Sequence, residues 1–376
     1  MKRRYILWVM AAALLAACNN DADETENGYV PSTEAIVFDA STDEGLTTRA
    51  PGEISNNAAL QGKSFGVFAS YTRNVKYENT TVSPDFMYNQ KVTYDGSWKY
   101  APTKYWPNNV EEDNTTPREY ITFFAYAPYE GDPDGSKCIA TFSEKYDLGD
   151  PWLVYKLAQD PWNATNPQVD LLYGVNADNS NKPWYDQQKP EYANKIKFTF
   201  KHALSCIGDL ISIKMGNDLS DRIAGYATIT INKVIINYTN LTSKARLVLN
   251  SQETPDWKQI VSGDVTTSRT LTINTNVALS TTSTEISTGQ GLFYIPLQVD
   301  IAPQRADITV EYTVNVTAGG TYTGTATGSF DLSTDDGQIG KKQAIALTLN
   351  KDLDLAHLVY ALTSDLATEP SYVRKR

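Results

Sequence analysis

Histidine, methionine and cysteine are scarce in this sequence, which has two, four and three of them respectively. His202 lies in a strand-like segment and His357 near the C-terminus, and neither has the H-x-x-x-H neighbour of a zinc site. No G-x-S-x-G motif, P-loop or dinucleotide-binding glycine pattern occurs. Carboxylates are abundant, but no spacing marks out a catalytic pair. The sequence predicts no metal, no cofactor and no enzyme.

Basic residues are fewer than acidic ones. The chain has 33 Lys and Arg and 44 Asp and Glu, which gives a net charge of −11. No basic stripe is present, which argues against nucleic acid and against an anionic membrane surface as partners. The chain is instead rich in β-forming residues, including 23 tyrosines and many Thr, Val and Ile. No long amphipathic helix stands out before the C-terminus. We expect an all-β protein.

Residues 1–18 read MKRRYILWVMAAALLAAC and have the three parts of an export signal: a basic start, an apolar centre and small residues before Cys18. The apolar run of 13 residues is shorter than the roughly 20 that a membrane-spanning helix needs. Leu-Ala-Ala-Cys resembles the bacterial lipobox, in which the cysteine is acylated. We therefore expect an exported protein tethered by lipid at Cys18; the alternative is an ordinary signal peptide with an incidental cysteine.

The two remaining cysteines, Cys138 and Cys206, lie 68 residues apart and form no disulfide framework. Unpaired cysteine packs as a small hydrophobe, so two buried free thiols are the favoured interpretation. A single disulfide is the alternative.

Strand-like segments alternate with turns along the chain. Ile36-Val37-Phe38 is the first apolar run, and Asp95-Gly96 is a hairpin signal between two alternating segments. The segment 120–128 is apolar enough for a buried central strand. From residue 195, lysines alternate with apolar residues. This alternation predicts a strand with one solvent-exposed face and one buried face. The second half then continues with strands at the spacing of a β-sandwich.

These features predict two β-sandwich domains. We assign residues 1–18 to the signal, 19–49 to a tether with a removable first strand, 50–200 and 201–350 to the two domains, and 351–376 to a tail. The tail is ambiguous. Leu353, Leu355, Val359 and Ala361 fit a strand face, whereas Leu358, Leu362 and Leu366 fit a helical stripe.

Several segments, in their order, resemble the fimbrillin family of Bacteroidales, the subunits of type V pili. The resemblance covers residues 10–215 and is carried by the following pieces: LAAC, IVFDA, TTRAPG, WKYAPTKYWPNN (98–109), ITFFAYAPYEG (121–131), DLLYG (170–174) and FTFKHALSCIGDLISI (198–213). It implies transthyretin-like sandwiches and an outer-membrane lipoprotein precursor. An arginine-specific protease would cut the matching bond, Arg49-Ala50, and release the strand Ile36-Val37-Phe38.

The resemblance further implies that a C-terminal segment of a neighbouring subunit fills the vacated groove, which is donor-strand exchange. The candidate donor residues are Leu353, Leu355, Val359 and Ala361. Two features depart from the family pattern: Pro51 follows the scissile bond, and the tail ends PSYVRKR. Pro51 bears on whether the protease accepts the site, and the tail suggests an accessory, tip or non-polymerising member instead of a shaft subunit.

We therefore predict a structural fimbrial subunit, anchored in the outer membrane and then incorporated into an extracellular fimbrium that mediates adhesion. Its partners would be other fimbrial subunits, the protease and a host or bacterial surface ligand. The alternative is a non-polymerising surface lipoprotein that binds glycans or host ligands through aromatic loops bearing Trp106, Trp152 and Trp184. Exposure of these indoles would favour the alternative.

Overall fold

The structure is a computed structural model. It describes residues 29–43, 53–108, 118–165, 167–178, 182–190, 195–250, 254–260, 266–287, 289–296, 304–332 and 340–353, and the backbone of 355–361. The predicted signal, Cys18 and the bond Arg49-Ala50 lie outside the described residues.

The described chain is almost entirely strand, as the composition predicts. The strands of the first half are β1 (Pro31–Ala35), β2 (Phe38–Thr42), β3 (Phe65–Arg73), β4 (Met87–Tyr94), β5 (Trp98–Lys99), β6 (Tyr105–Pro107), β7 (Glu119–Ala127), β8 (Ile139–Phe142), β9 (Trp152–Lys156), β10 (Leu172–Asn176), β11 (Trp184–Gln187) and β12 (Ile196–His202). Those of the second half are β13 (Ser205–Met215), β14 (Ala227–Thr242), β15 (Lys244–Val248), β16 (Asp256–Lys258), β17 (Thr266–Ala278), β18 (Thr284–Glu285), β19 (Leu292–Tyr294), β20 (Arg305–Val316), β21 (Thr321–Asp331), β22 (Lys342–Leu349) and β23 (Leu355–Ala361).

Two short helices, α1 (Asn57–Gln61) and α2 (Asn217–Ile223), complete these elements. Within the described residues, no helix has the length and apolar character needed to cross a bilayer.

The first half is built on an eight-stranded sheet with the order β2-β12-β10-β7-β3-β4-β5, in which β11 also pairs with β7. Every residue of β7 is buried, so the predicted central strand over 120–128 is confirmed. The pairs of this sheet are antiparallel except β2–β12, which is parallel. Strand β2 lies at the edge of the sheet and has one hydrogen-bonded neighbour, β12, among the described strands.

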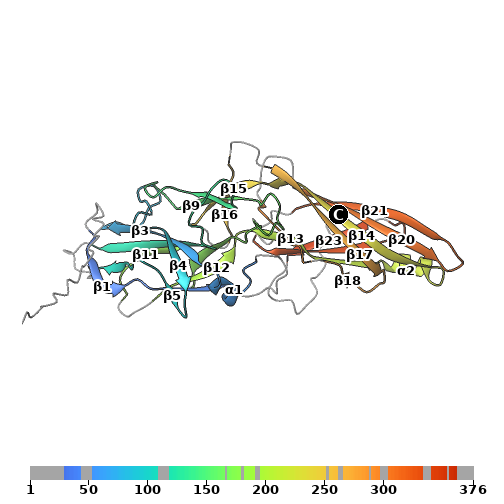
Figure 1. The fold of residues 1–376 in the computed structure, drawn as a ribbon, viewed down its shortest axis with the longest axis horizontal. Helices are drawn as coiled ribbons and strands as arrows, with labels where there is room; N and C mark the ends of the chain where they lie inside the picture. The colour runs from blue at the N-terminus through green and yellow to red at the C-terminus, as the bar shows by residue number, and fades with distance from the viewer. Residues whose placement is uncertain are drawn as a thin grey trace, which may run out of the picture.

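A four-stranded sheet, β16-β15-β9-β8, covers the other face of the large sheet. The core between them includes Phe68, Phe124, Tyr155 and Leu247. Strands β15 and β16 follow β14 in the sequence, yet β15 pairs with β9 of the first half. In Figure 1 these yellow strands lie over the first half of the elongated molecule. The predicted domain boundary at residue 200 stays a prediction, because β15 and β16, which follow residue 200 in the sequence, pack with the first half.

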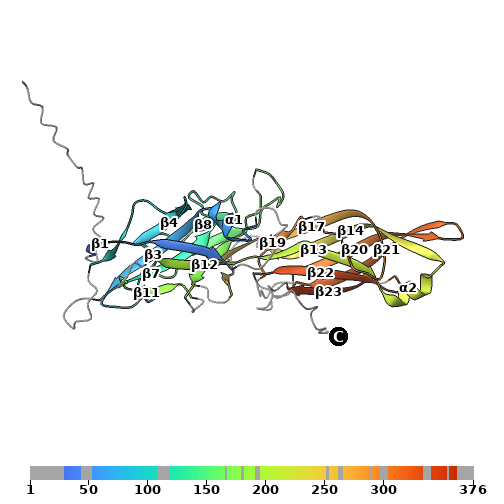
Figure 2. The ribbon, with the colours of Figure 1, turned by 90° about the horizontal axis from the view of Figure 1, so that it is seen from below.

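The second half is a sandwich of two sheets, β18-β13-β22-β23 with β19 beside β13, and β17-β14-β20-β21. Its core draws on both inner faces and includes Ile211, Ile236, Val310 and Ile345. Figure 2 shows β22 and β23 side by side, with β23 at the outer edge of its sheet. The tail over 355–361 is therefore strand and not helix. The transthyretin-like comparison stays an expectation.

Local sequence explains several of these elements. Asp95-Gly96 turns between β4 and β5, where Gly96 adopts a φ of 70°, so the predicted hairpin is confirmed. Ile196, Phe198 and Phe200 of β12 are buried, as the alternation predicts. Cys138 and Cys206 are buried free thiols, which confirms the favoured interpretation. Burial is the main cause that raises the pKa of both thiols.

Candidate functional site

Strand β2, which holds the predicted removable residue Phe38, pairs with β12 at the edge of the large sheet. Its parallel register pairs Phe38 with Ile196 and Thr42 with Phe200. Side chains alternate along it: Phe38 is 2% exposed, whereas the preceding Val37 is 39% exposed. Ile36, just before the strand, is also buried and faces the same core as Phe38. The predicted removable strand is therefore half-buried, with one apolar face in the core of the first half.

Phe38 fills a cage of four aromatic rings. Its ring centroid lies 5.2 Å from Tyr100, 5.8 Å from Phe123, 6.1 Å from Phe198 and 6.4 Å from Phe65. The contacts with Phe65 and Phe123 are edge-to-face, which is a favourable arrangement of aromatic quadrupoles. Loss of β2 would leave this cage empty and the backbone groups of β12 unpaired, and both are costly in water.

Further hydrogen bonds hold both ends of the segment 36–42. The backbone N–H of Ile36 donates to the Lys104 carbonyl at 2.9 Å, and Tyr100 Oη donates to the Ile36 carbonyl at 2.9 Å. At the far end, the Thr42 N–H donates to Asn57 Oδ1 at 2.7 Å, which links β2 to α1. Because the strand has one sheet neighbour, a single row of ladder bonds holds it in place.

Strand β1 forms a separate two-stranded pairing with β6. Two ion pairs tie the initial segment to the body: Glu34 to Lys189 at 3.8 Å and Asp39 to Lys195 at 3.9 Å. All four side chains are partly exposed, so each pair contributes little to stability. Attachment of residues 31–42 depends mainly on the pairing of β1 with β6, on the buried face of β2 and on the ladder between β2 and β12.

The chain just beyond the predicted cleavage bond is held differently. The Ile54 N–H donates to Asp170 Oδ2 at 2.8 Å, and Glu53 Oε2 lies 2.9 Å from Lys342 Nζ. The same ammonium lies 2.8 Å from Asp209 Oδ2. The side chains of Glu53 and Lys342 are 3% exposed and that of Asp209 1% exposed. Residue 53 is therefore anchored in a buried charge cluster that joins both halves.

The electrostatics of this cluster explain its pKa shifts. Burial raises the pKa of Glu53, and the neighbouring Lys342 ammonium only partly offsets this effect. Burial alone would lower the pKa of Lys342, but the Asp209 and Glu53 carboxylates outweigh it and raise the pKa. His202 lies nearby with Nδ1 3.0 Å from Asp170 Oδ1. Burial opposes its protonation, yet the Asp170 carboxylate raises the pKa of His202 overall.

Sequence reasoning did not identify the Glu53–Lys342–Asp209 cluster. Asp209 stands alone among apolar residues in SCIGDLISI, and a lone charge in such a run was the available signal. Its partner Lys342 lies 133 residues further along the chain, so no local pattern points to the pairing.

The predicted donor residues lie at the other end of the chain. Leu353 adopts a φ of 61° and packs against the core of the second half. Leu355, Val359 and Ala361 belong to β23, which pairs antiparallel with β22, opposite Leu349, Ile345 and Gln343 respectively. Strands β2 and β23 are therefore on different sheets, and each lies at the edge of its sheet.

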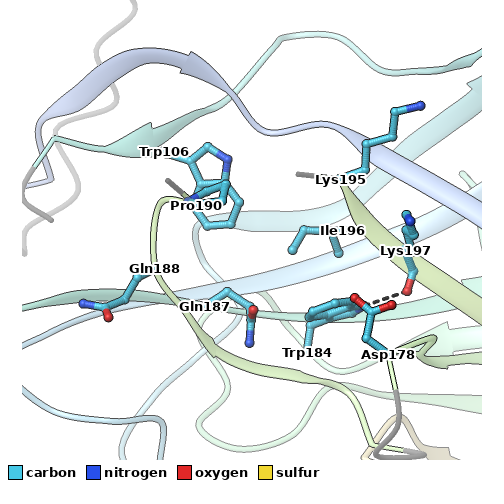
Figure 3. Close-up of a pocket in the computed structure, with 9 residues that line it drawn as sticks. All are labelled: Trp106, Asp178, Trp184, Gln187, Gln188, Pro190, Lys195, Ile196 and Lys197. Carbon is cyan, nitrogen blue, oxygen red and sulfur yellow. Dashed lines mark hydrogen bonds between the residues drawn. The ribbon is translucent and has the colours of Figure 1, made fainter. Parts of the chain in front are cut away.

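The tryptophans named for a glycan-binding alternative are not exposed. Trp106 and Trp184 are 2% and 8% exposed, and the guanidinium of Arg246 lies 4.1 Å from the centre of the half-buried Trp152 ring. The two buried indoles line a pocket of about 190 Å³, shown in Figure 3. The Trp184 indole N–H donates to the Lys197 carbonyl at 2.8 Å and is not free for a ligand.

The remaining pocket residues are Asp178, Gln187, Gln188, Pro190, Lys195, Ile196 and Lys197. Three of them, Lys195 to Lys197, belong to or immediately precede β12, beside the start of β2. The pocket is therefore next to the groove that β2 occupies.

Comparison with known proteins agrees with the resemblance noted in the sequence. The profile of the family described as fimbrillin-like matches residues 48–364. The fimbrium subunit Fim1C of Phocaeicola vulgatus is 26% identical over 258 residues, which are 65% of this chain and 62% of that protein. The chain thus spans less than two thirds of the length of this curated relative.

Two solved structures match the chain over most of its length, with TM-scores below 0.5. A candidate cell adhesion protein from Bacteroides uniformis covers 89% of this chain and 99% of its own, with 12% identity and a TM-score of 0.42. The fimbrial anchor protein Mfa2 from Porphyromonas gingivalis covers 88% of this chain and 97% of its own, with 12% identity and a TM-score of 0.34. On the extent of the family match, the chain belongs to the fimbrillin-like family, a family of structural and non-enzymatic proteins.

Proposed function

We propose that the chain is a subunit of a type V fimbria on the cell surface and that it assembles by exchange of its first strand. The observation that carries the proposal is the placement of Phe38. A buried aromatic side chain belongs to an edge strand with one sheet neighbour, and the strand ends seven residues before Arg49. Removing that strand converts a closed core into an acceptor groove.

The proposed precursor is exported, acylated at Cys18 and held in the outer membrane. Cleavage between Arg49 and Ala50 then separates residues 19–49, which include β1 and β2, from the body. The asymmetry of attachment supports this order of events. The upstream segment is held by the β1–β6 and β2–β12 ladders, the buried Phe38 side chain and exposed ion pairs, whereas Glu53 and Ile54 are held by buried polar contacts that include a charge cluster. The cut chain therefore keeps its new N-terminal segment and loses its first strand.

The proposed assembly uses two sheet edges, that of β2 in one subunit and that of β23 in its neighbour. The groove of one subunit takes an extended segment from the C-terminal region of a neighbour, which restores the ladder and fills the cage. Because the donor and the acceptor are different surfaces, the contact is heterologous and propagates as a filament. The two-domain organisation, the lipid anchor and adhesion to a host or bacterial ligand are part of the same proposal. The buried tryptophans give the glycan-binding alternative no specific support.

Digestion of the full chain with an arginine-specific protease tests the proposal. We expect a product beginning at Ala50 and ladders of oligomers that resist SDS. The variant Arg49→Ala should stay monomeric, whereas Arg222→Ala, an exposed arginine of α2, should behave as wild type. Cleavage at Ala50 that leaves only monomers would overturn the assembly step.

A further inference from the structure

The buried cluster of Lys342, Asp209 and Glu53 brings an amine and a carboxyl group into contact where water is excluded. Lys342 Nζ donates to Asp209 Oδ2 at 2.8 Å and lies 2.9 Å from Glu53 Oε2. The three side chains are only 1–3% exposed. Because Cγ of Asp209 is bonded directly to Oδ2, the amine nitrogen has a short approach to a carboxyl carbon, which is the geometry that favours reaction between them.

We propose that Lys342 and Asp209 condense to form an isopeptide bond between Nζ and Cγ, with Glu53 as the catalytic acid and base. The product is a covalent link between β13 and β22. The ion pair described above is the reactant of this step. The proposal concerns a modification within one chain and does not depend on strand exchange, so the two can be tested separately.

A bulge in β13 directs Asp209 toward Lys342. Strands β13 and β22 are parallel neighbours, side by side in Figure 2, and their register shifts between Cys206 and Leu210. Gly208 lies within this irregular stretch and adopts a φ of 77°, in the left-handed region that favours glycine. A bulge changes the direction of the side chains beside it, and Asp209 follows Gly208 directly. The acceptor carboxyl group is therefore positioned by the strand itself.

A second buried carboxylate holds the chain next to Glu53. The Ile54 N–H donates to Asp170 Oδ2 at 2.8 Å, and Asp170 Oδ1 lies 3.0 Å from His202 Nδ1. Asp170 is 1% exposed. It fixes the backbone beside the catalytic carboxyl group and is therefore a positioning residue.

Burial favours the amide over the ion pair. In water, a carboxylate and an ammonium resist condensation because solvation stabilises both charges. The cluster has lost most of that solvation, so a neutral amide and a released water molecule replace a costly pair of buried charges. Lys137 and Glu130 are equally close at 2.8 Å, but their side chains are 34% and 24% exposed. We expect no condensation between them.

The protonation of the cluster suits the assigned roles. Burial raises the pKa of Glu53, which favours its protonated form. The pKa of Lys342 is raised by the carboxylates of Asp209 and Glu53, against the effect of burial. Protonation of Glu53 removes one of these two contributions and so eases the loss of the ammonium proton, which the nucleophile requires.

The step balances without a co-reactant. One proton passes from the Lys342 ammonium to the Asp209 carboxylate, so both groups become neutral. The Nζ lone pair attacks Cγ and the N–C bond forms, while Glu53 donates its proton to the carbonyl oxygen. Glu53 then takes a proton from Nζ and gives it to one hydroxyl group on Cγ, which leaves as water when the C–O bond breaks. The other hydroxyl group returns its proton to Glu53 and becomes the amide carbonyl.

The bond would close most of the second half into one covalent ring. Asp209 and Lys342 are 133 residues apart in the sequence. Among the described strands of the second half, β13 is the first and β22 the last but one. A pulling force along the chain would therefore pass through the amide and not through the strands between these two positions.

Mass spectrometry of the purified full chain tests the bond. We expect the wild-type mass to be lower by one water than its sequence requires. Lys342→Arg keeps the cation without a nucleophilic amine and should have its full mass, and N-terminal processing changes both chains equally. Digestion of wild type should release a branched peptide that joins Lys342 to Asp209. The peptides of Lys137 and Glu130 are the matched control and should stay separate.

Substitutions of the two carboxyl groups separate their roles. Asp209→Asn keeps an electrophilic carbon and should lose ammonia instead of water, whereas Asp209→Ala should lose neither. Glu53→Gln should reduce the cross-linked fraction at least about tenfold, because it removes the general acid and base. A folded wild type of full mass, or a branched peptide that joins Lys342 to Glu53, would overturn the proposal.

Discussion

The Lys342 ammonium and the Glu53 carboxylate form a buried ion pair 2.9 Å long that connects the segment before α1 to β22. Asp209 of β13 completes the arrangement at 2.8 Å from the same ammonium. One cation thus faces two carboxylates, and Asp209 Oδ1 has no hydrogen-bond partner within the described part of the chain. Removing the cation would leave two buried like charges.

We expect Lys342→Met to lower the free energy of unfolding by about 3–5 kcal/mol, because it leaves Glu53 and Asp209 buried without a partner. Urea denaturation at neutral pH measures the change. Lys258→Met removes the cation of an exposed pair with Asp256 and should cost about 1 kcal/mol or less. Equal losses in the two variants would show that the buried cluster contributes nothing beyond a surface pair.

A pH-dependent contribution follows from His202. Its pKa in the folded chain is raised above the ordinary value near 6.5 because of the Asp170 carboxylate. A raised folded pKa stabilises the fold below the unfolded pKa, and this stabilisation is lost as pH rises through the folded pKa. We expect His202→Gln to lower the urea midpoint more at pH 5.5 than at pH 8.5. A destabilisation that is the same at both values, or larger at pH 8.5, would contradict the assigned direction.

The sequence predicts those elements that depend on neighbouring residues. Alternation identifies β12, the Asp95-Gly96 signal identifies the hairpin, and an apolar run identifies β7. Each of these signals is contained in fewer than a dozen residues.

Pairings between strands that are distant in the sequence could not be predicted from local residue patterns. The parallel contact of β2 with β12 joins residues more than 150 positions apart, and β15 crosses from the second half to pair with β9. Such choices depend on which edges remain open after the whole chain has packed, and local patterning does not record them. The same reason hides the link between Asp209 and Lys342.

The cage of Phe38 gives a prediction for the uncut precursor. Phe38→Ala should lower the free energy of unfolding by about 3–5 kcal/mol or, if β2 detaches first, should increase amide hydrogen exchange in that strand. Val37→Ala, one residue away on the exposed face, should have little effect on either measurement. Similar exchange of β2 in wild type and Phe38→Ala, with no loss of stability, would show that the ring does not hold the strand.

The close approach of Gly66 and Tyr126 sets a limit on the central strands. The two residues are directly opposite on β3 and β7, and a Cβ atom at Gly66 would lie 2.2 Å from the tyrosine ring. The ring cannot easily move aside, because Tyr126 Oη donates to Asn89 at 2.7 Å and accepts the Glu130 N–H at 3.1 Å. We therefore expect Gly66→Ala to cost about 1–3 kcal/mol in urea denaturation through overpacking.

Gly135→Ala is the matched control for this substitution, since a Cβ atom at Gly135 meets nothing within 4 Å. It should change the free energy of unfolding by less than about 0.5 kcal/mol. The double variant Gly66→Ala with Tyr126→Leu removes the ring that the new methyl group meets, so its loss should be smaller than the sum of the two single losses. Additive losses would mean that the methyl group and the ring do not compete for the same space, and that Gly66 is needed for another reason.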